Sequence, residues 1–189
     1  YTVTFNGTDS AGNSATTVSF TSVTYNTSAV DVFSSVTPSS NSFINSTTVS
    51  YSLSENLSSG TIKLIRTGGD SASDQTITLS GDNLSSGSRT STGSFNNGTL
   101  YSISFNGTTT GSSTATTFIS TNVSFDTTSP TITNILPISG STISNSNIGY
   151  TLNENLQSAQ VVFTRTSGNS DSSTHTISFS GTELNSGTR

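Results

Sequence analysis

The chain repeats itself at an interval of 99 to 100 residues. The segment Tyr-Thr-Val-Thr-Phe-Asn-Gly-Thr, which starts at Tyr1, returns from Tyr101 as Tyr-Ser-Ile-Ser-Phe-Asn-Gly-Thr. The segment Tyr-Ser-Leu-Ser-Glu-Asn-Leu, from Tyr51, returns from Tyr150 as Tyr-Thr-Leu-Asn-Glu-Asn-Leu. Such self-similarity indicates one structural unit used several times, and a period near 100 residues suits a small β-sandwich domain. It is too long for a solenoid coil or a propeller blade.

Apolar side chains alternate with serine and threonine through the repeated segments. The alternating positions are Val49, Tyr51 and Leu53; Ile62 and Leu64; Ile77 and Leu79; and Tyr101, Ile103 and Phe105, with counterparts at Ile148, Tyr150 and Leu152; Val161 and Phe163; Ile177 and Phe179; and Tyr1, Val3 and Phe5. A period of two predicts antiparallel strands with one buried and one wet face. Turn signals, among them residues 56–60 and 67–70, separate these runs. The pattern predicts an all-β fold.

Two short motifs resemble bacterial immunoglobulin-like (Big) repeats. The stretch from Asp9 to Asn13 reads Asp-Ser-Ala-Gly-Asn, as in the F–G hairpin of those repeats. The stretch from Phe125, Phe-Asp-Thr-Thr-Ser-Pro, is similar to the junction between successive repeats. The second copy departs from the hairpin motif, with Thr-Thr-Gly-Ser from Thr109, and the first copy departs from the junction motif at Tyr25. The resemblance implies tandem immunoglobulin-like antiparallel β-sandwiches in large surface proteins such as adhesins and biofilm proteins.

This resemblance implies domain boundaries that differ from the ends of the chain. Residues 1–27 are expected to form the last two strands (F and G) of a first domain, and residues 28–127 a complete domain. Residues 128–189 are expected to form the first five strands (A to E) of a further domain. Partial domains leave sheet edges and core faces bare. We therefore expect either a tandem array or a head-to-tail homopolymer, in which the five strands of one chain accept the N-terminal hairpin of the next by β-strand complementation.

The composition narrows the classes of partner. The chain has 43 Ser and 37 Thr, only 28% hydrophobic and 8% charged residues, and a net charge of −5. Disorder is the alternative that such a composition raises, but ten Phe and five Tyr in alternating runs favour a packed fold. Five Lys and Arg residues are too few for nucleic acid, which needs cations. The absence of cysteine excludes a disulfide scaffold, and no apolar run is long enough to predict a membrane span.

No residue pattern predicts catalysis. His175 is the single histidine, and no cysteine or second histidine accompanies it. A calcium site would need clustered carboxylates, and Asp9, Asp31 and Asp126 are the candidates. Each of them is replaced by a neutral residue in the other copy. We therefore predict a protein that is not an enzyme, with no catalytic, cofactor-binding or metal-ligating residues and no cofactor.

Two charged positions do recur, at Glu55 and Glu154 and at Arg66 and Arg165. The recurrence favours a role in the fold or in the contact between domains, and exposed ion pairs would contribute about 0–1 kcal/mol each. A repeated acidic calcium site is the alternative.

These patterns lead to two hypotheses for the function. The first is a structural repeat protein that forms an extracellular stalk or filament on a microbial cell surface, with copies of itself as the partner. The second is an adhesin binding module, whose loops recognise a glycan or a host or partner protein. Unusual aromatic or charged loop residues in one copy would favour the second hypothesis, and neither copy carries them clearly.

Overall fold

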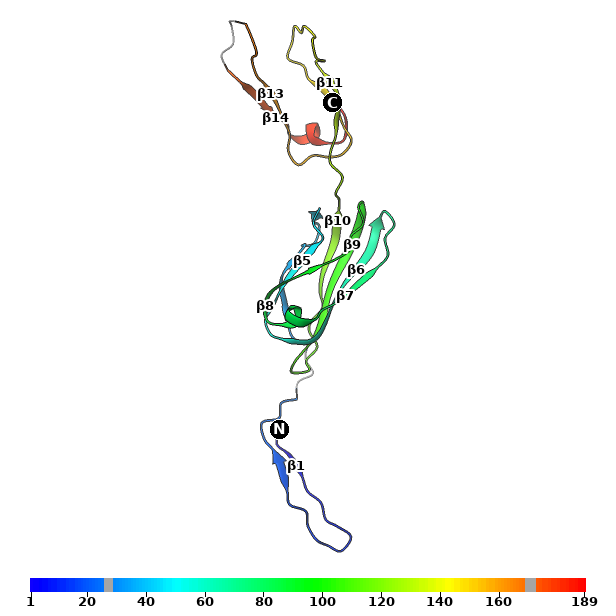
Figure 1. Ribbon diagram of the computed structural model, residues 1–189, viewed down its shortest axis with the longest axis vertical. Coiled ribbons are helices and arrows are strands. Elements are labelled where there is room, and N and C mark those ends of the chain that lie inside the picture. Colours follow the sequence, from blue (N-terminus) through cyan, green and yellow to red (C-terminus); the bar gives the residue numbers. More distant parts are fainter. Residues whose placement is uncertain (26–28, 169–172) are drawn as a thin grey trace. The chain divides into compact units, whose positions relative to one another are not determined.

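A computed structural model of the chain describes residues 1–25, 29–168 and 173–189, and it is dominated by antiparallel sheets (Figure 1). The contacts divide the chain into two compact units, Tyr1–Thr127 and Thr128–Arg189. Within the part described, no helix is long and apolar enough to cross a membrane.

The N-terminal hairpin, residues 1–25, is a two-stranded antiparallel sheet. It consists of β1 (Val3–Phe5) and β2 (Val18–Phe20). Val3 lies opposite Phe20 and Phe5 opposite Val18, so these four apolar side chains share one face. The rings of Phe5 and Phe20 meet edge to face, with centroids 6.2 Å apart.

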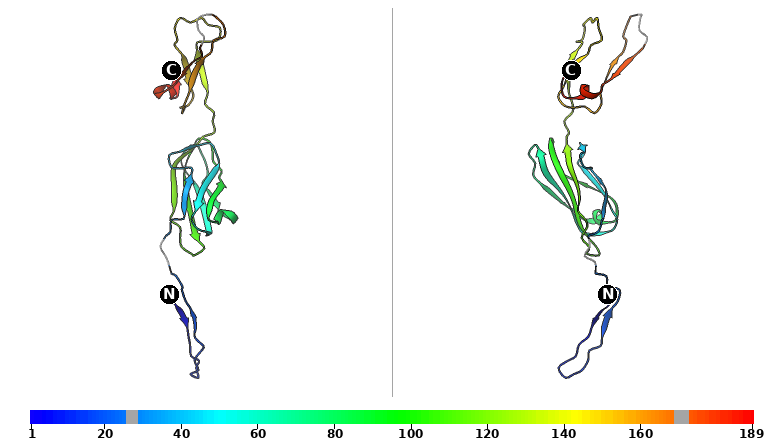
Figure 2. Two further views of the ribbon diagram at one scale, coloured as in Figure 1. Left: turned by 90° about the vertical axis from the view of Figure 1, so that its left-hand side faces the viewer. Right: turned by 180° about the vertical axis from the view of Figure 1, so that it is seen from behind.

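The central domain contains two sheets and one short 3₁₀ helix (Figure 2). Its elements are β3 (Phe33–Thr37), β4 (Phe43–Ile44), β5 (Thr48–Leu53), β6 (Leu57–Gly69), β7 (Gln75–Thr78), η1 (Gly81–Leu84), β8 (Gly87–Thr92), β9 (Thr99–Thr109) and β10 (Phe118–Phe125). One sheet has the strand order β3-β5-β8 and the other β4-β10-β9-β6-β7. All pairings are antiparallel except that of β4 with β10, which is parallel.

The two sheets of the central domain face each other across one hydrophobic core. The rings of Phe33, Tyr51 and Phe105, from β3, β5 and β9, lie 5.7 to 5.9 Å apart between centroids and join the sheets. Of the positions predicted to point inward, Ile77 is partly buried and the others are buried, including Val49, Tyr51 and Leu53 at 0, 1 and 3% exposure. The domain is therefore a β-sandwich whose core follows the period of two in the sequence.

The sequence prediction of turns at residues 56–60 and 67–70 is wrong for most of these residues. Strand β6 runs through Leu57–Gly69 and pairs with β9 over that length. Irregularities between Leu57 and Ser59 and between Arg66 and Gly68 absorb the turn-forming residues as β-bulges.

In the described part of the C-terminal unit, residues 128–168 and 173–189, there are five strands and a 3₁₀ helix. Its elements are β11 (Ile132–Leu136), β12 (Gly149–Leu152), β13 (Gln160–Phe163), β14 (His175–Ser178), η2 (Gly181–Leu184) and β15 (Gly187–Thr188). They form a sheet of order β11-β12-β15 and a separate β13-β14 hairpin. Of the hydrophobic side chains in the described part of this unit, only Tyr150 and Leu152 are buried.

The repeated sequence segments make matching local hydrogen bonds. The Tyr51 hydroxyl donates to the Asn83 carbonyl at 3.0 Å, and the Tyr150 hydroxyl donates to the Glu183 carbonyl at 2.8 Å. The Asn56 side-chain oxygen accepts from the Ser86 amide at 2.8 Å, just as Asn155 accepts from Ser186. The side chains that anchor η1 and η2 are therefore the ones that the repeat retains.

Candidate assembly surfaces

The N-terminal hairpin has the backbone geometry of the β9–β10 hairpin of the central domain. Val3 opposite Phe20 corresponds to Ile103 opposite Ser120, at a shift of 100 residues. The matching backbone hydrogen bonds are Ala15 to Gly7 (2.8 Å) with Ala115 to Gly107 (2.9 Å), and Asp9 to Asn13 (2.9 Å) with Thr109 to Ser113 (2.9 Å). The register of β10 against β9 shifts between Ser120 and Val123, where Asn122 has a positive φ of 55°, and Ser22 at the equivalent position of the hairpin has a φ of 61°. The hairpin therefore shares its register with β9 and β10 of the sandwich.

Most side chains on one face of this hairpin are exposed where their counterparts on β9 and β10 are buried. Tyr1 and Phe5 are 79 and 60% exposed, whereas Tyr101 and Phe105 are 1 and 0% exposed. Tyr25 is likewise 75% exposed. Val3, Val18, Phe20 and Val23 extend the same apolar set. We call the set Tyr1, Val3, Phe5, Val18, Phe20, Val23 and Tyr25 the hairpin face.

The C-terminal unit has a hollow with three apolar side chains in its lining. It is lined by Ile143, Ser144, Asn145, Ser146, Phe163, His175 and Ile177. By the sequence repeat, Ile143 corresponds to Ile44 of β4, and Phe163 corresponds to Leu64 of β6. In the central domain β9 and β10 lie between β4 and β6. The hollow, which we call the apolar hollow, thus occurs where the central domain has two strands.

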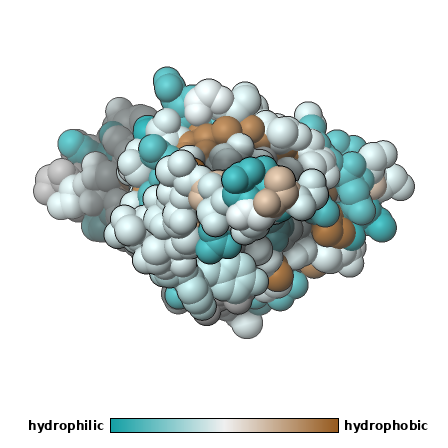
Figure 3. All heavy atoms as spheres, turned by 90° about the horizontal axis from the view of Figure 1, so that it is seen from below, coloured by the Kyte–Doolittle hydropathy of each residue, from teal (hydrophilic) through white to brown (hydrophobic). Residues whose placement is uncertain are grey.

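The walls of the apolar hollow are exposed to solvent. Ile143 and Ile177 are 49 and 42% exposed, and Phe163 is half-buried, whereas Leu64, whose strand β6 pairs with β9, is 0% exposed. Among the described residues of the C-terminal unit, β13 pairs with β14 alone. Figure 3 shows one face of the molecule, on which a few small patches of hydrophobic residues lie among residues of mainly weak polarity.

Asp9 holds the turn of the N-terminal hairpin. Its Oδ1 accepts hydrogen bonds from the amides of Ala11 (2.9 Å) and Asn13 (2.8 Å), and its Oδ2 accepts from the Asn13 side-chain amide (2.9 Å). These bonds, the Asn13 side chain first, hold the pKa of Asp9 below its ordinary value of 3.8. In the β9–β10 turn the Thr109 hydroxyl takes over one of them by accepting from the Ser113 amide at 3.2 Å.

The lowered pKa of Asp9 predicts how the turn responds to acid. Because the folded pKa lies below the unfolded one, the turn gains stability above the unfolded pKa and loses it as the pH falls through the folded pKa. A carbon-13 NMR titration of the Asp9 carboxyl should give a midpoint below 3.8. Replacing Asn13 with alanine should move that midpoint back towards 3.8. A wild-type midpoint at or above 3.8 would refute the role of these hydrogen bonds.

The recurring arginines bind backbone carbonyls in the described structure. Arg66 donates from Nε to the Asp70 carbonyl at 2.8 Å and from Nη2 to the Gly69 carbonyl at 2.6 Å. Arg165 donates in the same way to the Gly168 carbonyl. Both arginines therefore bind the backbone three or four residues further along the chain. One oxygen of Glu154, the counterpart of Glu55, is buried without a hydrogen-bond partner among the described residues.

The remaining sequence candidates do not gather into one site. Over residues 1–25, 29–168 and 173–189 no group of three or more His, Asp or Glu side chains is placed to hold a metal ion. Asp9 already uses both carboxylate oxygens in its turn. Asp31 is exposed, and His175 lines the apolar hollow.

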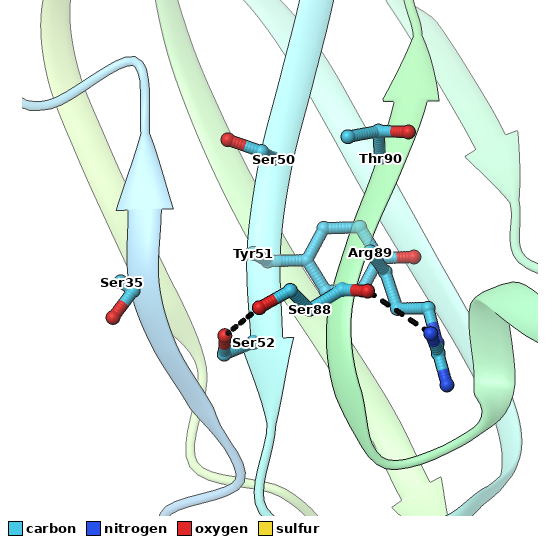
Figure 4. Close-up of a pocket in the computed structure, with 7 residues that line it drawn as sticks. All are labelled: Ser35, Ser50, Tyr51, Ser52, Ser88, Arg89 and Thr90. Carbon is cyan, nitrogen blue, oxygen red and sulfur yellow. Dashed lines mark hydrogen bonds between the residues drawn. The ribbon is translucent and has the colours of Figure 1, made fainter.

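A shallow polar depression lies on the outer face of the β3-β5-β8 sheet (Figure 4). It is lined by Ser35, Ser50, Tyr51, Ser52, Ser88, Arg89 and Thr90. Strand pairing places Ser52 opposite Ser88, and their hydroxyls hydrogen-bond at 3.1 Å. Arg89 is occupied with the carbonyls of Ser85, Ser86 and Ser88. The depression thus presents hydroxyl groups and part of one cation.

No protein-family model matches the chain, and neither the curated proteins nor the solved structures include a significant match.

Proposed function

We propose that the chain is part of a structural protein made of tandem immunoglobulin-like β-sandwiches, which forms an extracellular stalk or filament on a microbial cell surface. The observation that carries the proposal is the recurrence of the same local structure at an interval of 99 to 100 residues. The hairpin at residues 1–25 matches the β9–β10 hairpin in register, and the Tyr51 and Tyr150 hydroxyls make equivalent bonds. Repeated domains in one chain produce length, which is what a stalk or filament needs.

The strand arrangement of the central domain supports the immunoglobulin-like class. In that fold strands A, B and E share one sheet, and strands C, F and G share the other. Here β3, β5 and β8 share one sheet, and β6, β9 and β10 share the other. Tyr101 lies near the start of β9, and its hydroxyl accepts a hydrogen bond from the Asn96 amide, five residues upstream, at 2.8 Å. This contact resembles the tyrosine corner at the start of strand F.

Immunogold labelling of intact cells of the host tests the proposed location. Antibodies against the 189-residue chain should label the outside of unbroken cells, along fibres or a surface layer. Label that appears only after the cells are opened would contradict the proposal.

A glycan-binding adhesin module is the second candidate, and the hydroxyl-lined depression is the observation that favours it. Hydroxyl pairs such as Ser52 and Ser88 can exchange hydrogen bonds with a sugar. A glycan array with the wild-type chain and with a Ser52→Ala, Ser88→Ala variant tests it. Specific binding that the double variant loses would favour the adhesin over a plain spacer. If the wild-type chain binds no glycan, the adhesin hypothesis is refuted.

A further inference from the structure

We propose that the central domain bears tension along the chain, because the opening segment of its sequence is bound in parallel to its last strand. The inference goes one step beyond the proposed function and rests on it, since a stalk or filament transmits force through each of its domains in series. Both partners of this pairing lie within the complete central sandwich.

The opening segment and the last strand of the central domain form a parallel pair. β4 pairs with β10 in parallel, whereas every other strand pair of this domain is antiparallel. The Ser124 amide donates to the Ser42 carbonyl at 2.9 Å, and the Asp126 amide donates to the Ile44 carbonyl at 2.9 Å. Backbone hydrogen bonds therefore join the opening segment to the end of the last strand.

The contact continues along β10 towards the start of that strand. The Asn41 amide donates to the Thr121 carbonyl at 2.8 Å, and the Thr121 amide donates to the Ser40 hydroxyl at 3.0 Å. The Asn122 side-chain amide donates to the Asn41 side-chain oxygen at 3.1 Å. Asn41 and Asn122 have φ values of 61° and 55°, a region that asparagine adopts more readily than most residues. The local sequence thus suits this contact.

Another contact lies before the start of β10, where Val30 forms a parallel bridge to the chain. The Val30 amide donates to the Thr114 carbonyl at 3.0 Å, and the Val30 carbonyl accepts a hydrogen bond from the Thr116 amide at 2.8 Å. The opening segment and the closing segment of the domain therefore run in the same direction. We call the contacts between residues 30–44 and residues 114–126 the parallel clamp.

The direction of pull decides how the bonds of the parallel clamp break. Tension enters the domain before Val30 and leaves it after Asp126. These two points lie at opposite ends of the clamp, because Val30 lies beside Thr116 and Ile44 lies beside Phe125. Pulling therefore slides one segment along the other and loads several bonds together. If the two segments were antiparallel, the same pull would act at one end and open the bonds singly.

Loading several bonds together slows unfolding under force. The lifetime of a domain under force is governed by its unfolding rate. The net contribution of one hydrogen bond corresponds to a factor of roughly 2 to 10 in that rate when the bond is broken in the transition state. Bonds that must break together multiply their factors. The domain should therefore last longer when it is pulled along the chain than when it is pulled where bonds open singly.

Two pulling directions on the full 189-residue chain test the proposal. The chain has no cysteine, so introduced cysteines alone fix where the handles attach. The end handles, Ala29→Cys with Ser129→Cys, pull at the two flanks of the central domain. The opposed handles, Thr48→Cys with Thr92→Cys, pull at a directly opposite residue pair at one end of the antiparallel β5 and β8. In constant-force magnetic tweezers, unfolding at the same force should be on the order of 10-fold slower with the end handles.

A pair of variants at one residue tests the parallel clamp itself. Asp126→Pro removes the amide that donates to the Ile44 carbonyl. The matched control is Asp126→Ala, which loses the same side chain but keeps the amide. With the end handles, Asp126→Pro should unfold roughly 2- to 10-fold faster than Asp126→Ala. With the opposed handles, the two variants should unfold alike, because rupture then begins between β5 and β8.

The outcomes separate this inference from the proposed function. Equal unfolding rates with the two handle pairs would overturn the clamp, and so would equal rates for Asp126→Pro and Asp126→Ala with the end handles. The handle comparison changes no residue of the clamp contacts, so it decides the question even if Asp126→Pro does not fold. A negative result would leave the surface location standing, because immunogold labelling tests the location alone. Label confined to opened cells would refute the location and leave the force measurement unchanged.

Discussion

Replacing Phe105 with alanine should destabilise the central domain by about 3–5 kcal/mol, since a buried aromatic ring leaves a cavity that its neighbours cannot close. Phe105 is 0% exposed, and its ring contacts those of Phe33, Tyr51 and Phe118 at centroid distances of 5.7, 5.8 and 6.2 Å. The free energy of unfolding of a small domain is only about 5–15 kcal/mol in total. Hydrogen exchange of the β6 and β9 amides in the full chain measures the loss.

The matched control for this prediction is Ser104→Ala, one residue earlier on β9. Its side chain points to the outer face, so the change should be within about 0.5 kcal/mol. Exchange that is equally slow in Phe105→Ala and Ser104→Ala would show that the ring cluster does not hold the two sheets together.

Replacing Gly69 with alanine should cost at least about 2–3 kcal/mol, because strain and a steric clash act together there. Gly69 has a φ of 71°, and a Cβ atom on it would lie 2.1 Å from the Gly98 carbonyl oxygen. The neighbouring variant Gly68→Ala is the control. Its Cβ would make an ordinary contact at 3.7 Å with Leu100, and its φ is not in the positive range. Similar thermal unfolding of the central domain in both variants would refute the close approach at Gly69.

The alternation of side chains is the part of the fold that the sequence predicts well. Ile62, Leu64 and Ile103 are each flanked along the strand by residues that are polar or face outward, and all three are fully buried. A period of two leaves a strand little choice of face, because a slip by one residue would expose every apolar side chain. Phe5 follows the same rule in the N-terminal hairpin, although its face is exposed.

The ends of the strands were harder to predict, because glycine has two roles. In residues 56–60 the sequence suggests a turn, but a Cβ on Gly60 would lie 2.8 Å from Leu79 Cδ1. That glycine allows close packing within a bulged strand. Whether a glycine forms a turn or allows a close contact inside a strand depends on residues distant in sequence. A local sequence pattern does not reveal those contacts.

The roles of Arg66 and Arg165 were also not apparent from the sequence. Their recurrence indicated a structural role, and the oppositely charged Glu55 and Glu154 suggested ion pairs. Arg66 instead binds two carbonyls at the end of β6, those of Gly69 and Asp70, three and four residues away. A five-donor guanidinium satisfies several carbonyls at once, and the curvature of the chain that brings them within reach is visible only in the structure.

Electron microscopy of the native protein tests the proposed tandem array most directly. Gold-labelled antibodies against the central domain would mark each sandwich of the repeat. The account predicts fibres or stalks on the cell surface that carry the label along their length. Labelled particles that are free in solution, with no fibre or stalk, would contradict it.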